Sequence, residues 1–427
     1  MGSVEEGNRM VRLLVALLVF VVSASAQAAK YLVSYRDDSV VSTEHLSPEE
    51  IRFHWRAMTA RAEASVLGAR LLQNARTLWI ANATMAELDD EEAARVRKNP
   101  RVSSVMLLGR RARLSDSALA PKRPYGEYTY GLENIGLHEV NRRQPRLDGA
   151  GQRVGIIDTG VQATHPSLRK KTVAFHDYIG RGEETYDDYG HGSFVAGVIA
   201  GDPSDGTRIG VAPAAKLVVA KAFSQFGGSE DASLLAALQW MADPDGNPRT
   251  DDGPRVISNS WNVDSNIAAQ TPADEPFCRV IDRLRELGIL SVFSAGNDGP
   301  GASSILVPGA CPSALTVGAS DSDDAIADFS SRGPIHWKSG ALPKPELAAP
   351  GVDVFSAWRD SEYVYKSGTS MATPFAAGAA ALLLQHNPSL KPDEIKSALA
   401  KSARDKGPSG FDPAYGHGIL WLPAALD

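Results

Sequence analysis

From about residue 150, short apolar runs alternate with segments that have the length and composition of helices. The apolar runs have few polar interruptions, as expected for strands that are buried on both faces. Strands of this kind, joined by crossover helices, predict an α/β fold: a doubly wound, mostly parallel sheet with helices on both faces. The expected strands are 153–157, 216–221, 255–258, 289–294 and 314–317, and the expected helices are 192–200, 232–241 and 276–287.

Two polar residues come shortly after expected strands. Asp158 follows the strand 153–157, and Asn297 follows the strand 289–294. Taken singly, each is more often a turn residue. The sites of parallel sheets, however, lie at the carboxyl ends of the strands, which makes both residues candidates for function.

Ser370 lies in Gly368-Thr369-Ser370-Met371-Ala372-Thr373-Pro374, directly before the apolar run 375–384. That run predicts a buried helix with the serine at or near its N-terminus. Unpaired N–H groups and the helix dipole favour developing negative charge there. For an isolated serine, a helix N-cap is the simplest interpretation. A nucleophilic role requires a base and a group that orients the base.

His191 begins another expected helix, and on its own would be interpreted as a solvated side chain. Together with Asp158 and Ser370 it completes a set of carboxylate, imidazole and hydroxyl, in the chain order Asp, His, Ser. Acyl transfer uses these groups to fix the imidazole tautomer, to move the proton and to attack the carbonyl carbon. This order is the one found in subtilisin.

Four segments, 154–160, 191–197, 294–300 and 368–378, resemble the signature blocks of the subtilisin-like serine proteases, in the family's order and with similar spacing. The resemblance runs from about residue 150 to the end of the chain. Residues 259–261 and 293–300 are most similar to the bacillopeptidase F-like branch. The resemblance implies a serine endopeptidase that needs no cofactor for its chemistry. It assigns Asp158, His191 and Ser370 to the catalytic triad and Asn297 to the oxyanion hole.

Two positions depart from the family's pattern. Phe194 and Phe375 stand where the family usually has histidines, and we expect both rings to pack in the core. Neither departure changes the implied roles of the triad.

The resemblance also implies that a polypeptide substrate binds as an added strand between two edge segments of the enzyme. Leu306 would lie near the floor of the first pocket and make it shallow. Trp261, Glu230 and Asp231 would flank a more distant pocket, where the two acids either favour basic residues or form a solvated face. The residues implied in substrate binding are Gly227, Gly228, Ser229, Ser260, Trp261, Asn262, Ser294, Ala295, Gly296 and Leu306.

Residues 30–113 predict a small ferredoxin-like α+β domain with a βαββαβ pattern. The expected strands are 31–35, 69–72, 77–81 and 102–108, and the expected helices are 48–67 and 85–98, the second capped by Thr84. This region resembles the inhibitory propeptide of the family, which implies an autoprocessed zymogen. The basic segment 110–118 looks like an exposed linker open to cleavage, and the window for the first cut is 110–117.

The N-terminus predicts export. An apolar run of about ten residues, 13–22, is too short to span a bilayer and precedes two small-x-small cleavage signals, Ala24-Ser25-Ala26 and Ala26-Gln27-Ala28. Met10 gives a better signal sequence than Met1, because Glu5 and Glu6 make the first residues acidic. The expected organisation is a signal peptide over 1–28, a propeptide domain over 30–113, a linker and N-terminal arm over 114–149, and the peptidase domain over 150–427.

Export to a secreted or periplasmic location places the chain in an oxidising compartment, where its two cysteines can pair. We predict a Cys278–Cys311 disulfide, with two buried free thiols as the alternative. The net charge of −7 argues against a nucleic-acid partner. A monomer without a stable membrane anchor is expected, with its own propeptide as an intramolecular inhibitor.

Metal binding has weak support in the sequence. Asp202 and Asp205 lie where many members of the resembled family bind calcium, and Asp243, Asp245 and Asn247 form a second oxygen-rich loop. Neither segment has the spacing of an EF-hand, so a structural calcium ion and a plain Asp-Gly turn both stay open.

Two other functions share most of these features. A catalytically silent, subtilase-like binding protein would lack a triad or oxyanion residue, and none is missing here. An exopeptidase of the tripeptidyl-peptidase kind would keep the triad and add a group that holds the free amine of the substrate. Cleavage of a peptide with blocked ends distinguishes the three.

Overall fold

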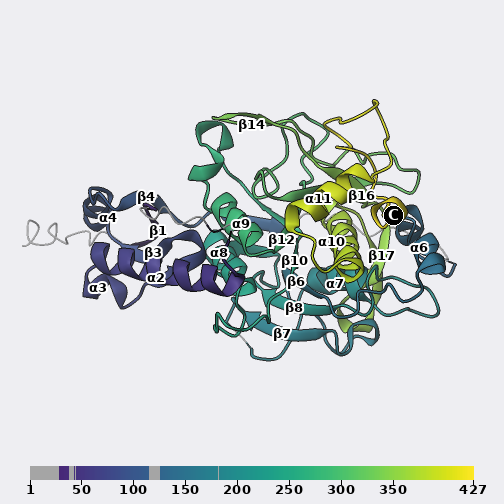
Figure 1. Cartoon of the computed structure of the whole chain (residues 1–427), viewed down its shortest axis with the longest axis horizontal. Helices are drawn as coiled ribbons and strands as arrows, with labels where there is room; N and C mark the ends of the chain where they lie inside the picture. The colour runs from purple at the N-terminus through teal and green to yellow at the C-terminus, as the bar shows by residue number, and fades with distance from the viewer. Residues whose placement is uncertain (1–27, 38–42, 44, 115–125, 181) are drawn as a thin grey trace, which may run out of the picture.

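The computed structural model describes residues 28–37, 43, 45–114, 126–180 and 182–427, so the expected signal sequence lies almost wholly outside the described residues. Two units are visible in Figure 1: a small N-terminal one, coloured purple, and a large one that contains the remaining chain. No helix in the described part of the chain is both long and apolar enough to cross a membrane.

The large unit is built on the predicted parallel sheet. Its seven strands lie in the order β16-β13-β12-β10-β6-β8-β7, and every pair of neighbours is parallel. The five predicted strands are confirmed, and two edge strands that were not predicted, β7 and β16, complete the sheet. The strands are β6 (Arg153–Asp158), β7 (Thr172–Asp177), β8 (Lys216–Lys221), β10 (Val256–Asn259), β12 (Leu290–Ser294), β13 (Leu315–Ser320) and β16 (Leu347–Pro350).

Helices cover both faces of this sheet (Figure 1). Side chains of β6 show how the strand serves two cores: Val154 and Ile156 belong to the buried cluster that contains α7 and α10, whereas Ile157 belongs to the cluster that contains α8 and α9. The fold class is therefore as predicted. The helices of the large unit are α5 (Tyr130–Asn134), α6 (Leu137–Arg143), α7 (His191–Ala200), α8 (Asp231–Met241), α9 (Pro276–Glu286), α10 (Thr369–His386), α11 (Pro392–Lys401) and α12 (Leu422–Ala425).

The N-terminal unit is an antiparallel sheet with the order β2-β3-β1-β4 and βαββαβ connectivity. Its elements are β1 (Ala29–Tyr35), α2 (Pro48–Val66), α3 (Ala69–Leu72), β2 (Arg76–Leu78), β3 (Ala83–Leu88), α4 (Asp90–Arg97) and β4 (Val102–Leu107). The predicted pattern is right, but several of its boundaries are wrong.

The errors in the N-terminal unit have local causes. Residues 69–72 form the short helix α3 and not a strand, and residues 79–81 form a 3-10 turn after β2. Thr84 does not cap a helix: it lies inside β3, where its hydroxyl donates to Glu63. Asp89 caps α4 instead, in a reciprocal capping box with Glu92.

Three short sheets complete the fold. One of them, the three-stranded sheet β11-β5-β9, joins the two units. Its strands are β5 (Arg111–Leu114), β9 (Gly228–Glu230) and β11 (Trp261–Val263). The other two are the hairpins β14 (Ile335–Trp337) with β15 (Gly340–Leu342) and β17 (Val354–Ala357) with β18 (Tyr363–Lys366).

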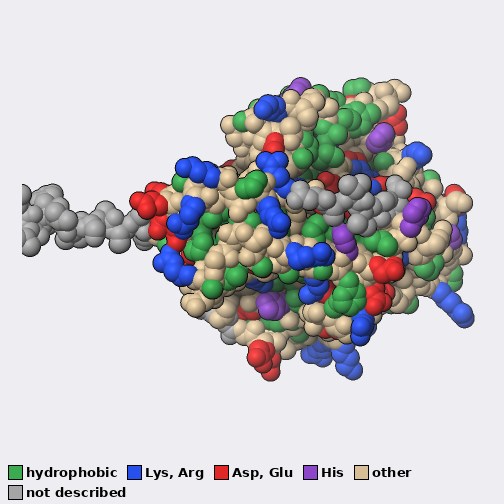
Figure 2. Space-filling view, turned by 60° about the vertical axis from the view of Figure 1, so that its left-hand side comes forward, with side chains coloured by type: hydrophobic (Ala, Val, Ile, Leu, Met, Phe, Trp, Pro, Cys, Tyr) green, Lys and Arg blue, Asp and Glu red, His purple; other side chains and the backbone are tan. Residues whose placement is uncertain are grey.

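The units share a buried cluster as well as a sheet. Leu32, Trp55 and Trp79 of the N-terminal unit lie in the same cluster as Phe277 of α9 and residues of α8. Figure 2 shows basic side chains gathered over the N-terminal unit and near its boundary with the large unit.

Candidate active site

Asp158 and His191 meet at the carboxyl end of the central strand. Asp158 is the last residue of β6 and His191 the first of α7, and both are fully buried. His191 Nδ1 lies 2.8 Å from Asp158 Oδ1 and 2.9 Å from Oδ2. A carboxylate accepts hydrogen bonds only, so this pair fixes the proton on Nδ1 and leaves Nε2 of the neutral ring as the basic atom.

A polar network holds the loop that carries His191. The Asp187 carboxylate accepts from the amides of Tyr189 and Gly190 and from the amide and hydroxyl of Ser193, while Thr159 accepts from the Gly192 amide. The donor residues of all these hydrogen bonds lie within two positions of His191 in the sequence. The network therefore fixes the position of the imidazole.

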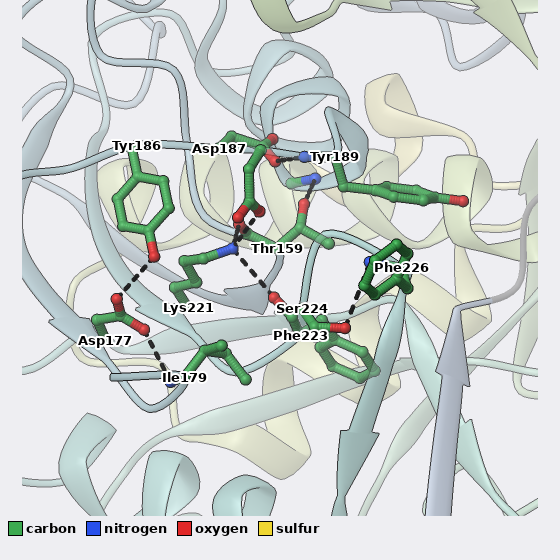
Figure 3. Close-up of polar contacts among 12 residues, drawn as sticks. Thr159, Asp177, Ile179, Tyr186, Asp187, Tyr189, Lys221, Phe223, Ser224 and Phe226 are labelled. Carbon is green, nitrogen blue, oxygen red and sulfur yellow. Dashed lines mark hydrogen bonds and ion pairs between the residues drawn. The ribbon is translucent and has the colours of Figure 1, made fainter. Parts of the chain in front are cut away.

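Lys221 supports the same region from β8. Figure 3 shows its ammonium reaching the backbone oxygen atoms of Thr159 and Phe223, at 2.7 and 3.1 Å. It also pairs with Asp188 at 2.6 Å. Because Lys221 is opposite Asp158 in the parallel register, the ammonium anchors the turn that follows the Asp158 strand.

Ser370 is the second residue of α10 and is fully buried. Its hydroxyl donates to the carbonyl oxygen of Ser260 at 2.9 Å, and the Ser260 hydroxyl donates to the carbonyl of Ser370 at the same distance. Ser370 and the start of β11 are therefore in direct contact.

Asn297 lies beside the same helix start. Its Oδ1 accepts from the amide of Thr369 at 3.0 Å and from the Thr369 hydroxyl at 2.9 Å. Because an amide group is planar, holding Oδ1 in this way turns the Nδ2 donor away from Thr369. The structure thus brings Asn297 next to the residue that precedes Ser370.

The predicted substrate-binding segments flank β5. Gly228 and Ser229 pair with Arg113 and Ala112 on one side. Trp261 and Asn262 pair with Leu114 and Arg113 on the other. Both pairings are antiparallel, so β5 fills the position of an added strand. Residues 111–114 are a strand and not a linker, although the side chains of Arg111 and Arg113 are exposed as predicted. Residues 115–118 lie outside the described part of the chain.

The remaining predicted residues surround this strand. Asn262 Nδ2 donates to the carbonyl of Ser294 at 3.1 Å, and the Gly296 amide donates to the Thr369 hydroxyl at 3.2 Å. Gly227 has a positive φ of 73°, and a side chain there would lie 3.4 Å from Leu114. Ala295 is buried. Half-buried Leu306 precedes Val307, whose carbonyl accepts from the Val263 amide.

Trp261, predicted to flank a more distant pocket, has a fully buried ring that packs edge-on against Phe277 and Phe293. Its backbone pairs with β5. Phe194 and Phe375 are also buried in the core, as expected, and the Phe194 ring packs edge-on against Trp358.

The two residues predicted as metal ligands lie in different local settings. Asp202 pairs with Lys171 at 2.6 Å, and Asp205 lies in a turn with a φ of 48°. Three other carboxylates, Asp243, Asp245 and Asp252, do lie close together within the described residues. Burial raises the pKa of Asp243, and the nearby Arg56 guanidinium opposes this shift.

Cys278 and Cys311 form the predicted disulfide, with a Cα–Cα distance of 5.2 Å. Cys278 lies in α9, and Cys311 follows β12 and its loop. The bond therefore ties α9 to the segment that precedes β13.

Comparison with known proteins identifies the family of this chain. The family model described as Peptidase_S8, the Subtilase family, matches residues 149–418, which is more than half of the chain. The chain belongs to the subtilase family. It is a subtilisin-like serine endopeptidase, and its relatives include members of the bacillopeptidase F branch.

Three relatives of this subtilase show how far the similarity extends. Serine protease AprX of Bacillus subtilis (strain 168) is 35% identical over 66% of this chain and 67% of its own. Bacillopeptidase F of the same organism is 37% identical over 64% of this chain, but the match spans only 20% of that relative's length. Subtilisin DY of Bacillus licheniformis is 33% identical over 69% of this chain and 97% of its own.

Sequence reasoning missed the residues that position the candidate site. Asp187 and Lys221 have no recognisable local signal, because a polar residue in a loop or at a strand end is common. Glu275 precedes Pro276 at the start of α9, a pattern that predicts only a helix N-cap. Glu275 contacts Arg110, which lies 165 positions earlier in the chain. Local sequence patterns do not predict a contact over that separation.

Proposed function

We propose that this subtilase is an exported zymogen whose triad is Asp158, His191 and Ser370. Ser370 Oγ attacks the carbonyl carbon of the scissile bond and gives its proton to His191 Nε2. The C–N bond then breaks, and the amine leaves with that proton. Water hydrolyses the acyl-enzyme through the same imidazole, which restores the serine. Asp158 keeps the proton on Nδ1 throughout.

The oxyanion needs donors that are fixed before the reaction starts. We assign this role to Asn297 Nδ2 and the backbone N–H of Ser370. The support is the orientation of the Asn297 amide, whose oxygen is already held by Thr369. The start of α10 adds the positive end of its dipole.

Residues 30–113 are proposed as the inhibitory propeptide. One observation carries this assignment: β5 pairs with β9 on one side and β11 on the other, as an extended polypeptide substrate would. Leu114 lies opposite Trp261, the neighbour of Ser260, which contacts Ser370. A chain bound in this way runs toward Ser370, in agreement with a first cut in the window 110–117.

Ser370→Ala tests the proposal. The variant should fold, remain at precursor length and cut neither itself nor casein, because only the nucleophile is removed. Ser389→Ala, which changes an exposed serine beyond the same helix, is the matched control and should mature normally. Gel mobility, N-terminal sequencing and circular dichroism give the readouts. Normal maturation of Ser370→Ala in a protease-free host would contradict the triad assignment.

A further inference from the structure

Two buried carboxylates of the large unit lie beside the residue that precedes β5. Asp231 is the first residue of α8, directly after β9, and Glu275 is the N-cap residue of α9. Both are 0% exposed. Neither belongs to the catalytic residues proposed above, and burying two carboxylates is unfavourable unless a cation pairs with them.

The cation that pairs with them is Arg110, the residue that precedes β5. Its Nη1 and Nη2 donate to the two oxygens of Glu275 at 2.9 and 3.0 Å, and its Nε donates to Asp231 at 3.1 Å. The guanidinium also lies over the ring of Phe277, 5.5 Å from its centroid. This bidentate geometry, with an aromatic face, is the arrangement that selects arginine over lysine.

Backbone contacts fix the register of Arg110. The Gly109 amide donates to Asp231 Oδ1 at 3.0 Å, and the Asp231 amide donates to the carbonyl of Arg110 at 3.2 Å. The other arginines of the segment are held differently. Arg111 is exposed, and the Arg113 guanidinium pairs with the exposed acids Asp264 and Asp298.

Contacts within the large unit hold the Glu275 carboxylate, whereas the Asp231 carboxylate accepts from Gly109 and Arg110. Glu275 also accepts from the Ser265 hydroxyl at 3.0 Å and from Gln270 Nε2 at 3.3 Å, and its backbone leads directly into α9. When the N-terminal segment is cut and leaves, Glu275 keeps its contacts with Ser265 and Gln270, and Asp231 remains the first residue of α8. Two carboxylates without their arginine partner then remain beside the place of Arg110.

We propose that Asp231 and Glu275 form a subsite that selects an arginine side chain in polypeptide substrates. The arginine occupies the Arg110 position, four residues before Leu114 in the cleft. This inference rests on the proposed function, because it treats β5 as bound in the way a substrate is bound. It makes the enzyme selective at a point far from the scissile bond, in addition to the pocket next to Ser370.

Peptides that copy residues 108–120, with blocked ends, test the subsite on the matured enzyme. Replacing Arg110 with Ala should lower kcat/KM by about 30-fold or more, since it leaves two buried charges unpaired. Replacing Arg111 with Ala removes the same charge from an exposed position and should change kcat/KM less than threefold. Arg110→Lys keeps the charge but loses the bidentate contact, so its peptide should fall between the two.

Variants of the enzyme give the reciprocal test. The preference for the parent peptide over its Arg110→Ala version should shrink in Asp231→Asn and in Glu275→Gln. It should persist in Asp274→Asn, which changes an exposed carboxylate next to Glu275. Equal effects of the Arg110→Ala and Arg111→Ala peptides would overturn the subsite while leaving the endopeptidase intact. Casein that stays uncut would instead reject the proposed function.

A measurement on the full chain does not depend on turnover. In a Ser370→Ala background, Arg110→Ala should speed amide hydrogen exchange in β5 by tenfold or more, whereas Arg111→Ala should leave it unchanged. The same exchange rate in both variants would show that the acidic pair contributes no selective recognition, and would overturn the inference.

Discussion

The two main sheets of this protein are buried in different ways. The seven-stranded sheet is covered on both faces by helices of its own unit, and its central strand carries side chains into both cores. The four-stranded sheet has a small cluster of its own, which includes Val33 and Leu88, while Leu32 on the other side of β1 joins the cluster of the large unit. The seven-stranded sheet thus has both of its covering layers within its own unit, whereas one side of the small sheet is covered by the large unit.

Ion pairs and hydrogen bonds cross the boundary between the two units. Arg56 pairs with Asp243, Arg283 pairs with Asp37 at 3.0 Å, and Arg52 donates to the carbonyl oxygens of Pro248 and Thr250. Residues 30–113 carry more basic than acidic side chains, whereas the whole chain has a net charge of −7. The two units therefore attract each other, yet partly exposed ion pairs stabilise a contact only weakly. A weakly stabilised contact agrees with the proposal that residues 30–113 are a propeptide released after cleavage.

The largest expected effect concerns peptide hydrolysis, because all the proposed catalytic residues lie in the large unit. Asn297→Ala should lower kcat of the matured enzyme by about 10²–10³-fold, the loss known for the equivalent donor in subtilisin. KM should change little, because the donor acts on the oxyanion and not on the ground-state carbonyl. Asn266→Ala, in a loop outside the site, is the control. A kcat within threefold of the parent would remove Asn297 from the oxyanion hole.

The disulfide tests the stability of the large unit alone, because both of its cysteines lie there. Cys278→Ala should lower the free energy of unfolding by about 3–4 kcal/mol, from the entropy of a loop closed across 33 residues. Denaturant unfolding of the Ser370→Ala precursor measures this. The double variant with Cys311→Ala should be about as unstable as the single one, because either change breaks the same bond. Additive losses would indicate that the bond itself contributes little.

The two sheets were predicted from the sequence with different accuracy, because their strands are buried in different ways. The five predicted strands of the large sheet are continuous apolar runs, so their limits could be placed within one residue, except that β13 ends three residues later than predicted. The edge strand β7 is Thr172–Asp177, where polar residues interrupt the run, and it was not predicted. In the N-terminal unit a residue such as Thr84 has one interpretation as a cap and another as a strand residue, and only the contact with Glu63 decides.

The residues of the candidate site also differ in how well the sequence predicts them. Asp158, His191, Asn297 and Ser370 lie in local segments with a recognisable pattern, so they could be predicted. Glu275 could not, because it acquires its partner only when the fold brings β5 against α9. Asp231 was predicted near a distant pocket, with a solvated face as the alternative, and its full burial favours the pocket.

The smallest expected effect comes from a matched pair of leucines on the small sheet. Leu32 and Leu88 are both fully buried, but Leu32 packs in the shared cluster and Leu88 in the small unit's own. Each change to Ala should cost about 2–3 kcal/mol, the low end for such sites, since a thin layer can partly collapse. The two variants should differ in which segments lose protection from hydrogen exchange. In the Ser370→Ala precursor, Leu88→Ala should speed hydrogen exchange within residues 29–107 alone, because it weakens only that core. Leu32→Ala should also speed exchange in α8 and α9, because it loosens the docked face. If both variants affect α8 and α9 equally, the small unit has no separate core, and the two sheets do not differ in the way proposed here.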